Sequence, residues 1–363
     1  MMADYYILSS RKICSRPVQA ATTEFEDVLV ECCGGVLFTP APSGDVAARG
    51  RLPARRTMLP PRHSRSEQVL IVVGNHLGFV VTLLASIPDY RRRFDVICAY
   101  IIDAFPFASE LSKPLWRRRL SRFSRTLSSL DHLFVPIGLT AATLGDLYGV
   151  PTSFVPMACD VVRFGSGGSD RPIDLMGYGR QHAAHSAAFA DAYNDPASHR
   201  IYSHTDHIVI GAITDFHRHR RLFWKNLCRS RVALAYDPLA VNPNGQFPCS
   251  FVSLRWFECL TAGCLIAGRR PTCPEMDDLF FWEDSTIEVP EKTEDVVPFM
   301  EDLLADTERL DAAHHRNYTH ALAHHDWRYR IASMLDRLQL PHPEPLQRNL
   351  EQLRERCRTL IFA

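Results

Sequence analysis

The sequence predicts an α/β protein with two domains, each built on a parallel sheet that is covered by helices. The chain has 363 residues, which is more than one hydrophobic core usually serves. Short, continuously apolar runs alternate with helical stretches, and this alternation is typical of buried parallel strands. The Gly- and Ser-rich segment 163–171 interrupts the alternation, which then begins again. We therefore expect two successive α/β domains joined by this segment.

In the first domain, four apolar runs predict strands at 68–73, 94–102, 133–136 and 152–156. Helices are expected between them, at 79–87, 116–130 and 141–148. Ahead of these strands, residues 24–38 predict a helix that closes at Gly34-Gly35 and then a short strand. Residues 40–66 are rich in Pro, Gly, Ala and Arg and lack an apolar period, so they predict a loop or an insert.

In the second domain, strands are predicted at 173–178, 207–212, 232–235 and 264–267. Helices are predicted at 181–193 and 216–230 and across 292–340, with a terminal amphipathic helix at 346–360. These elements divide the chain into an N-terminal domain at 1–165, a C-terminal domain at 166–340 and a terminal segment at 341–363. In sheets of this kind, ligands bind at the carboxyl ends of the strands. We therefore expect the site in a cleft between the two domains.

The composition excludes several classes of protein. Formal net charge is zero, which argues against a nucleic-acid binder that depends on broad phosphate neutralisation. No stretch approaches 18 consecutive apolar residues, so we expect no spanning helix and at most peripheral membrane contact. The eleven cysteines are an odd number and no signal peptide is visible, so they predict buried thiols in a reducing compartment. A cytoplasmic location is expected.

Segment 250–267 is the most informative stretch. Arg255, Glu258 and Ala262 lie at i, i+3 and i+7, so on a helix they share one face. Gly263 is expected to end that helix, because glycine tolerates a positive φ. A carboxylate one turn before such an ending is consistent with a nucleotide-ribose site. An ordinary amphipathic helix with a surface salt bridge produces the same pattern, and both readings stay open.

Three further polar residues follow predicted strands. Arg180, in the sequence Gly177-Tyr-Gly179-Arg180, stands at a turn where backbone N–H groups and a guanidinium can bind phosphate. A tight turn with a solvated Arg explains it equally well. His76 and Asp103 each follow a first-domain strand, where either can serve as a general base. For Asp103, a helix N-cap or turn role is the alternative.

Other motifs point away from metal and dinucleotide chemistry. The dinucleotide signature G-x-G-x-x-G is absent, since His182 stands where its third glycine would be. Histidine pairs occur at 182/185, 204/207, 217/219, 314/315 and 324/325. None lies in an H-E-x-x-H motif and no C-x-x-C pair accompanies them, so we expect no metal site and no cofactor. Basic runs at 91–93, 117–125 and 218–221 are expected to be solvated helix faces, although they can also contact polyanions.

Four pieces in chain order resemble the bacterial glycosyltransferases of the GT-B fold, of the "group 1" type with a spore-maturation-like C-terminal half. They are Val155-Pro-Met-Ala-Cys-Asp160-Val-Val-Arg-Phe164, the strand from Ile173 that ends in Gly179-Arg180, Ser253-Leu-Arg-Trp-Phe-Glu-Cys-Leu-Thr-Ala-Gly263, and His325-Asp-Trp-Arg-Tyr-Arg330 followed by Met334-Leu335. The resemblance covers roughly residues 150–335. It implies two Rossmann-like domains that face each other across a cleft, with a C-terminal helix crossing back onto the first domain.

The resemblance also implies an activity, the transfer of a sugar from a UDP- or GDP-sugar to an acceptor hydroxyl without a metal. Glu258 would hold the ribose, and the donor would lie against a set of second-domain residues: Gly179, Arg180, Ser253, Arg255, Glu258 and Gly263. The acceptor, a glycan, a lipid-linked glycan or a small molecule, would enter from the first domain, where His76 or Asp103 would take its proton.

Two departures from the family pattern leave other classes open. Ser250 stands where many retaining enzymes carry an acid, and no Lys follows the Gly-Arg turn. A catalytically silent protein that binds a nucleotide or glycan is therefore the alternative. A metal-dependent hydrolase that uses the histidine pairs is a third hypothesis, and it requires bound zinc.

Overall fold

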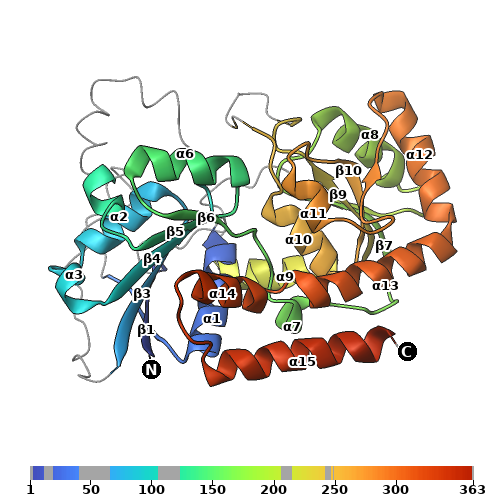
Figure 1. Ribbon diagram of the computed structural model, residues 1–363. Coiled ribbons are helices and arrows are strands. Elements are labelled where there is room, and N and C mark those ends of the chain that lie inside the picture. Colours follow the sequence, from blue (N-terminus) through green and yellow to red (C-terminus); the bar gives the residue numbers. More distant parts are fainter. Residues whose placement is uncertain are drawn as a thin grey trace, which may run out of the picture. The chain divides into compact units, whose positions relative to one another are not determined.

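The computed structural model describes residues 3–11, 19–40, 66–104, 123–205, 215–241, 247 and 249–361 (Figure 1). The chain divides into two compact units. Unit 1 comprises Met1–Pro156 and Trp327–Glu351, and unit 2 comprises Met157–Asp326 and Gln352–Ala363. The Gly- and Ser-rich segment thus falls inside unit 2, where the Ser166 N–H donates to Thr261 O at 3.2 Å. The chain re-enters unit 1 at Trp327, fourteen residues before the expected start of the terminal segment at 341.

Unit 1 contains a six-stranded parallel sheet in the order β2-β1-β3-β4-β5-β6. Its strands are β1 (Ala3–Leu8), β2 (Val36–Phe38), β3 (Glu67–Gly74), β4 (Val96–Ile101), β5 (His132–Val135) and β6 (Thr152–Phe154). The strands predicted from the apolar runs are confirmed. Strand β1 was not predicted, because Asp4 and two tyrosines interrupt its aliphatic pattern. It is nevertheless buried along Tyr5–Leu8, between β2 and β3.

The helices of unit 1 cover both faces of this sheet (Figure 1). They are α1 (Ala20–Cys33), α2 (Leu77–Ala85), α3 (Tyr90–Arg93), α6 (Gly138–Tyr148) and α14 (Trp327–Arg337). Phe25 of α1 packs on Trp327 of α14 and on Tyr100 of β4, with ring centroids 4.4 and 5.0 Å apart. On the opposite face, α2 and α6 bury Val80 and Leu144 against the core. As predicted, α1 ends at Gly34, whose φ is +60°.

Unit 2 contains a five-stranded parallel sheet in the order β11-β10-β9-β7-β8. Its strands are β7 (Ile173–Gly177), β8 (Tyr202–His204), β9 (Ser230–Tyr236), β10 (Leu265–Arg269) and β11 (Ile287–Glu288). The predictions of β7, β9 and β10 are confirmed. The predicted strand at 207–212 lies wholly outside the described residues, and so does the predicted loop at 40–66 apart from its two end residues. The predicted helix at 116–130 is described only from residue 123, and residues 123–127 are helical.

The helices of unit 2 are α7 (Val161–Phe164), α8 (Ala183–Tyr193), α9 (Phe216–Leu227), α10 (Leu254–Thr261), α11 (Glu275–Leu279), α12 (Thr293–Ala305) and α13 (Thr307–His324). The helical stretch predicted at 292–340 is three helices, because Asp306 caps α13 by accepting from the Arg309 N–H and the chain leaves unit 2 after Asp326. Helix α15 (Glu344–Ile361) begins in unit 1, where Asn349 donates to Glu31 of α1.

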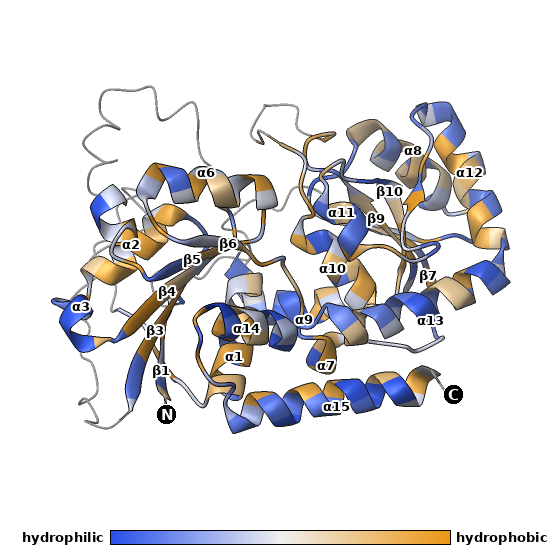
Figure 2. Ribbon diagram, in the orientation of Figure 1, coloured by the Kyte–Doolittle hydropathy of each residue, from blue (hydrophilic) through white to orange (hydrophobic). Residues whose placement is uncertain are grey.

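Hydropathy follows these layers. Figure 2 shows β3 and β4 as hydrophobic and most of α15 as hydrophilic. Among the described residues, no helix is both long and apolar enough to cross a membrane. Within the same residues, no group of three or more His, Cys, Asp and Glu is placed to hold a metal ion.

Each sheet reverses its strand order at one place. In unit 1 the reversal lies between β1 and β3, and in unit 2 it lies between β7 and β9. Ligands of open parallel sheets bind in the crevice at such a switch point, beyond the carboxyl ends of the strands. The crevice of each unit is therefore bordered by the segments that follow β1 and β3 in unit 1 and β7 and β9 in unit 2.

Burial of His314 predicts a pH-dependent stability for unit 2. Burial and the nearby Arg171 lower the pKa of His314 from 6.5 to about 4, and its Nε2 lies 2.8 Å from Arg231 O. Between pH 6.5 and pH 4, His314 is protonated in the unfolded chain but neutral in the folded chain. The free energy of unfolding therefore falls as the pH drops from 6.5 to 4. The full loss is ~3 kcal/mol. Urea unfolding across this range checks it, with His314→Gln expected to flatten the dependence because its amide still donates but does not titrate.

Candidate functional site

Helix α10 confirms the predicted helix of the informative segment, and its expected apolar face is buried. Trp256, Phe257 and Leu260 are fully buried. The helix ends as predicted at Gly263, whose φ is +67°. The Gly263 N–H donates to Leu260 O and the Cys264 N–H donates to Cys259 O, which is the hydrogen-bond pair of a Schellman ending.

Glu258 lies on α10 with only 5% of its surface exposed. Its Oε1 is 2.6 Å from Nη1 of Arg220, which projects from α9. The side chains of this pair are 6% and 16% exposed, so it is not the surface salt bridge that the helix pattern alone also allows. Sequence reasoning missed Arg220, because it lies within a basic run that reads as a solvated helix face. Its pairing with a buried acid on another helix depends on the tertiary structure, and the basic run gives no indication of it.

Arg255 lies one turn before Glu258 and contacts the turn that follows β7. Its Nη1 donates to Arg180 O at 2.5 Å, and its guanidinium lies 5.4 Å from the centroid of the Tyr178 ring. Gly179 has a φ of +62°, and a Cβ placed there would stand 2.5 Å from Arg255 Nη2. The buried Nε of Arg255 has no hydrogen-bond partner among the described residues. The structure thus brings Gly179, Arg180 and Arg255 together at the carboxyl end of β7.

The remaining two predicted residues of unit 2 stand at opposite ends of α10. Ser253 is the N-cap residue and its side chain makes no capping hydrogen bond. Gly263 follows the other end, where its backbone faces Ser166 O and the Arg171 guanidinium. A helix of eight residues is about 12 Å long, so Gly263 lies apart from the cluster at Gly179 and Arg255.

Replacing Gly179 is expected to weaken donor binding more than folding. A Cβ at this position forces the end of Arg255 to move, and the positive φ adds roughly 1–2 kcal/mol of backbone strain. We expect Gly179→Ala to lower nucleotide affinity about tenfold, as for one lost charge-assisted hydrogen bond. Isothermal titration with UDP and GDP measures it. Gly149→Ala is the matched control, because Gly149 also has a φ of +62° but no atom within 4 Å of the added Cβ.

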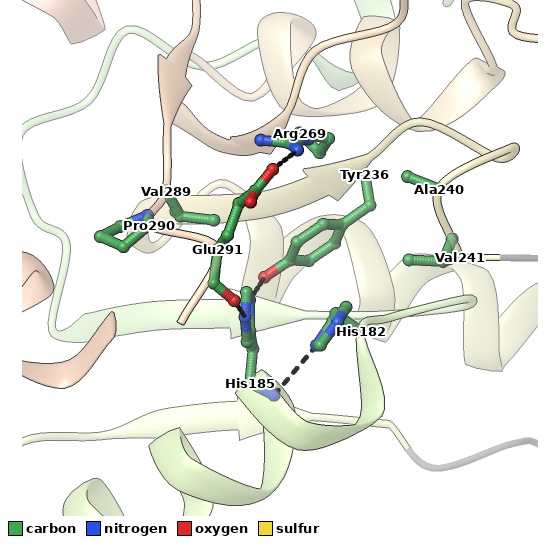
Figure 3. A pocket seen from close by; sticks show the side chains of 9 residues that line it. All are labelled: His182, His185, Tyr236, Ala240, Val241, Arg269, Val289, Pro290 and Glu291. Carbon is green, nitrogen blue, oxygen red and sulfur yellow. Dashed lines mark hydrogen bonds and ion pairs between the residues drawn. The ribbon is translucent and has the colours of Figure 1, made fainter. Parts of the chain in front are cut away.

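A pocket of about 230 Å³ opens at the carboxyl ends of the unit 2 strands (Figure 3). Nine residues line it: His182, His185, Tyr236, Ala240, Val241, Arg269, Val289, Pro290 and Glu291. They end or follow β9 and β10 and follow β7 and β11, so the pocket adjoins the switch point between β7 and β9. An ion pair joins Arg269 to Glu291 on one wall. The concave shape and mixed lining are those of a small-molecule site.

His185 is a fixed part of that pocket. Its Nε2 lies 3.3 Å from Glu291 O, and its Nδ1 lies 3.2 Å from the Tyr236 hydroxyl. Because a carbonyl only accepts, Nε2 carries the proton and Nδ1 accepts from the tyrosine. Burial lowers the pKa of His185, which favours this neutral form. The imidazole of His185 is thus held in one orientation at the wall of the pocket.

Asp237 follows β9 and is buried. It accepts hydrogen bonds from the Leu239 N–H at 3.0 Å and from the Ser250 hydroxyl, while burial raises its pKa. Ser250 Oγ in turn accepts from the Thr272 N–H at 2.8 Å. Ser250 is therefore hydrogen-bonded to the carboxyl group that follows β9. Sequence reasoning passed over Asp237 because a strand-end Asp reads as a turn residue.

In unit 1, the two predicted bases lie at one edge of the sheet. His76 follows Asn75 directly, and the Asp103 N–H donates to Asn75 O at 2.6 Å. His76 exposes more than a third of its surface, yet neighbouring protein atoms partly desolvate the imidazole and lower its pKa. It is the N-cap residue of α2, and its ring packs on Phe79 with centroids 4.4 Å apart.

Glu26 of α1 is a second acid of this region that the sequence did not single out. Its Oε2 accepts from Ser9 Oγ at 2.7 Å and from Arg11 Nε at 2.6 Å, beyond the end of β1. Burial raises the pKa of Glu26 to about 7, with the Arg11 cation opposing that rise. Because β1 itself was not predicted, this neighbourhood was not visible in the sequence.

Comparison with known proteins agrees with this architecture. Residues 184–336 match a family model described as glycosyl transferase-like. HepE from Anabaena, solved in complex with UDP and glucose, has a TM-score of 0.53 and 10% identity, over 93% of this chain and 100% of that one. The N-terminal domain of trehalose-6-phosphate phosphatase from Candida albicans has a TM-score of 0.55 and 10% identity, over 93% and 97%.

At such low identity, the two solved structures show the fold alone. A search of curated proteins finds no match for the sequence. The spore-maturation-like part of the resemblance stays a prediction. The glycosyl transferase-like match covers residues 184–336, and the two parallel sheets have the fold of the GT-B glycosyltransferases.

Proposed function

We propose that this protein is a glycosyltransferase that takes its sugar from a UDP- or GDP-sugar bound on unit 2. The observation that carries the proposal is the cluster at the β7/β9 switch point, where Arg255 is locked against Gly179 and lies one turn from the buried Glu258. Arginines beside a glycine turn suit a diphosphate, and a carboxylate suits the two hydroxyls of a ribose. HepE, which has the same fold, was solved with UDP and glucose.

Each part of such a donor has a candidate subsite. The diphosphate would contact Arg255, Arg180 and the backbone N–H groups that follow Ser253 at the start of α10. The ribose would bind Glu258. The nucleobase would enter the pocket between Tyr236 and Arg269. Gly263 has no role in this proposal, because it lies at the far end of α10.

The proposed reaction is a displacement at the anomeric carbon. A hydroxyl oxygen of the acceptor bonds to that carbon, and the bond from carbon to the diphosphate oxygen breaks with its electron pair leaving on the nucleoside diphosphate. The acceptor proton passes to His76 or Asp103. Arginine cations and the α10 dipole stabilise the leaving diphosphate, so the proposal needs no metal ion. The acceptor would be a glycan, a lipid-linked glycan or a small molecule.

Turnover with a panel of UDP- and GDP-sugars tests the proposal. The purified protein is incubated with each donor and release of the nucleoside diphosphate is measured with and without candidate acceptors. We expect release with at least one donor, undiminished by EDTA. Nucleotide binding without release from any donor would instead support the catalytically silent alternative. Absence of both binding and release would overturn the donor site itself.

A further inference from the structure

We propose that Arg220 is a positioning residue, which holds the Glu258 carboxylate in the orientation that accepts the donor ribose. This inference rests on the proposed function, because it assumes that Glu258 binds ribose. It adds a residue from α9, outside the turn after β7 and outside α10. The ion pair of 2.6 Å between Arg220 Nη1 and Glu258 Oε1 is its starting observation.

The guanidinium of Arg220 is itself held in place by packing on aromatic side chains. Its guanidinium lies over the rings of Phe223 and Trp224, with distances to the ring centroids of 4.5 and 4.9 Å. Trp224 is 4% exposed and stacks on Phe164 at 4.8 Å with an interplanar angle of 3°. A guanidinium that packs on two rings and pairs with a carboxylate is restricted in its orientation. Arg220 is therefore a rigid support for Glu258.

The charges of the ion pair also support a positioning role for Arg220. A carboxylate offers about four lone-pair positions, so the pair with Arg220 leaves acceptor capacity for two ribose hydroxyls. Isolated burial of the Glu258 charge would be costly, and the arginine supplies its counter-ion. Buried ion pairs contribute little net stability compared with apolar packing, so stability alone is a poor reason for this one. The position of the ion pair fits a different role, which is to orient the Glu258 carboxylate for binding.

The pair is also joined to the phosphate side of the site. Phe223, one turn after Arg220, packs edge-on against Tyr178 with centroids 4.8 Å apart. The Tyr178 hydroxyl donates to Arg255 O at 3.3 Å. Tyr178 immediately precedes Gly179, so α9, α10 and the turn after β7 share one set of contacts. A shift of Arg220 would act on Glu258 first, because that is its ionic partner.

The test compares the affinity for UDP with the affinity for 2′,3′-dideoxy-UDP, or the guanine pair if the donor panel selects guanine. A ribose contact makes the protein prefer the nucleotide with both hydroxyls. We expect Arg220→Gln to lower UDP affinity about tenfold and to abolish most of this preference, with dideoxy-UDP affinity little changed. Arg220→Lys is expected to restore part of the preference, since it keeps the charge but loses the planar fork.

Arg221→Gln is the matched control, because it removes the same charge from an exposed position on the same helix. It should leave both affinities unchanged. The double variant Arg220→Gln with Glu258→Gln removes both buried charges, and thermal unfolding of all variants confirms that they fold. If Arg220→Gln alone does not fold, Arg220→Lys still reports on the preference, and folding of the double variant shows that the unpaired Glu258 charge caused the unfolding.

The outcomes separate the inference from the proposed function. Loss of the preference in Glu258→Gln together with its retention in Arg220→Gln would overturn the role of Arg220 and leave the ribose site standing. Equal weakening of UDP and dideoxy-UDP in Arg220→Gln would also overturn it, because that pattern marks a direct phosphate contact. A preference that survives Glu258→Gln would instead remove the ribose assignment on which the inference rests.

Discussion

Glu258→Gln is expected to raise the dissociation constant for the donor nucleotide by roughly 10- to 100-fold. Glu258 is 5% exposed. A hydrogen bond from a ribose hydroxyl to a charged group contributes roughly 1.5–3 kcal/mol to the binding free energy. Glutamine keeps the shape but has only one acceptor oxygen and no charge. Isothermal titration with UDP and GDP measures the change.

The same substitution leaves Arg220 without its anion, so a loss of stability must be separated from a loss of binding. Thermal unfolding of the variant, with and without nucleotide, makes that separation. Glu308→Gln is the control, because Glu308 lies exposed on α13 of the same unit. An unchanged dissociation constant in a folded Glu258→Gln variant would refute the ribose assignment.

Removal of the proposed base, His76, is expected to lower the turnover rate more than Glu258→Gln does. His76→Ala should lower kcat by roughly 10²- to 10⁴-fold while leaving donor affinity in place, since general-base catalysis contributes that much. Desolvation lowers the pKa of His76, so the neutral, proton-accepting form persists at and above its ordinary value of 6.5. We therefore expect the rate of the wild-type protein to be flat above that pH and to fall only below it.

Two companion variants make this prediction specific. His132→Ala controls for loss of a histidine from unit 1, because His132 lies at the start of β5 and bonds to Ser153 Oγ at 2.8 Å. Asp103→Asn tests the other predicted base at the same sheet edge. A normal rate in His76→Ala with a strongly reduced rate in Asp103→Asn would transfer the role to Asp103.

Local sequence signals predicted much of this fold. The runs that became β3, β4 and β9 are long and aliphatic, and such runs are buried wherever they pair. The ending of α10 was also local, because Gly263 tolerates the φ of +67° that a Schellman ending requires. Strand β1 escaped prediction because its burial comes from its neighbours β2 and β3 rather than from its own alternation of residue types.

The candidate site divides in the same way. Arg255 and Glu258 were found because both lie on one face of a single helix, and a helical period is visible in sequence. Their actual partners were not visible. Arg220 is 38 residues away from Glu258 in the chain, and Gly179 is 76 residues away from Arg255. Only the order of the strands brings such segments to one sheet edge.

By itself, the sequence determined the α/β class, the identity of the second-domain motifs and the helix that carries Glu258, because each depends on residues within a few turns of one another. The tertiary structure decided which cation neutralises Glu258, where Gly263 lies and which strand ends form the pocket. Those depend on the parallel pairing of β7 with β9 and of β9 with β10, and such pairing joins residues whose separation along the chain leaves no local pattern.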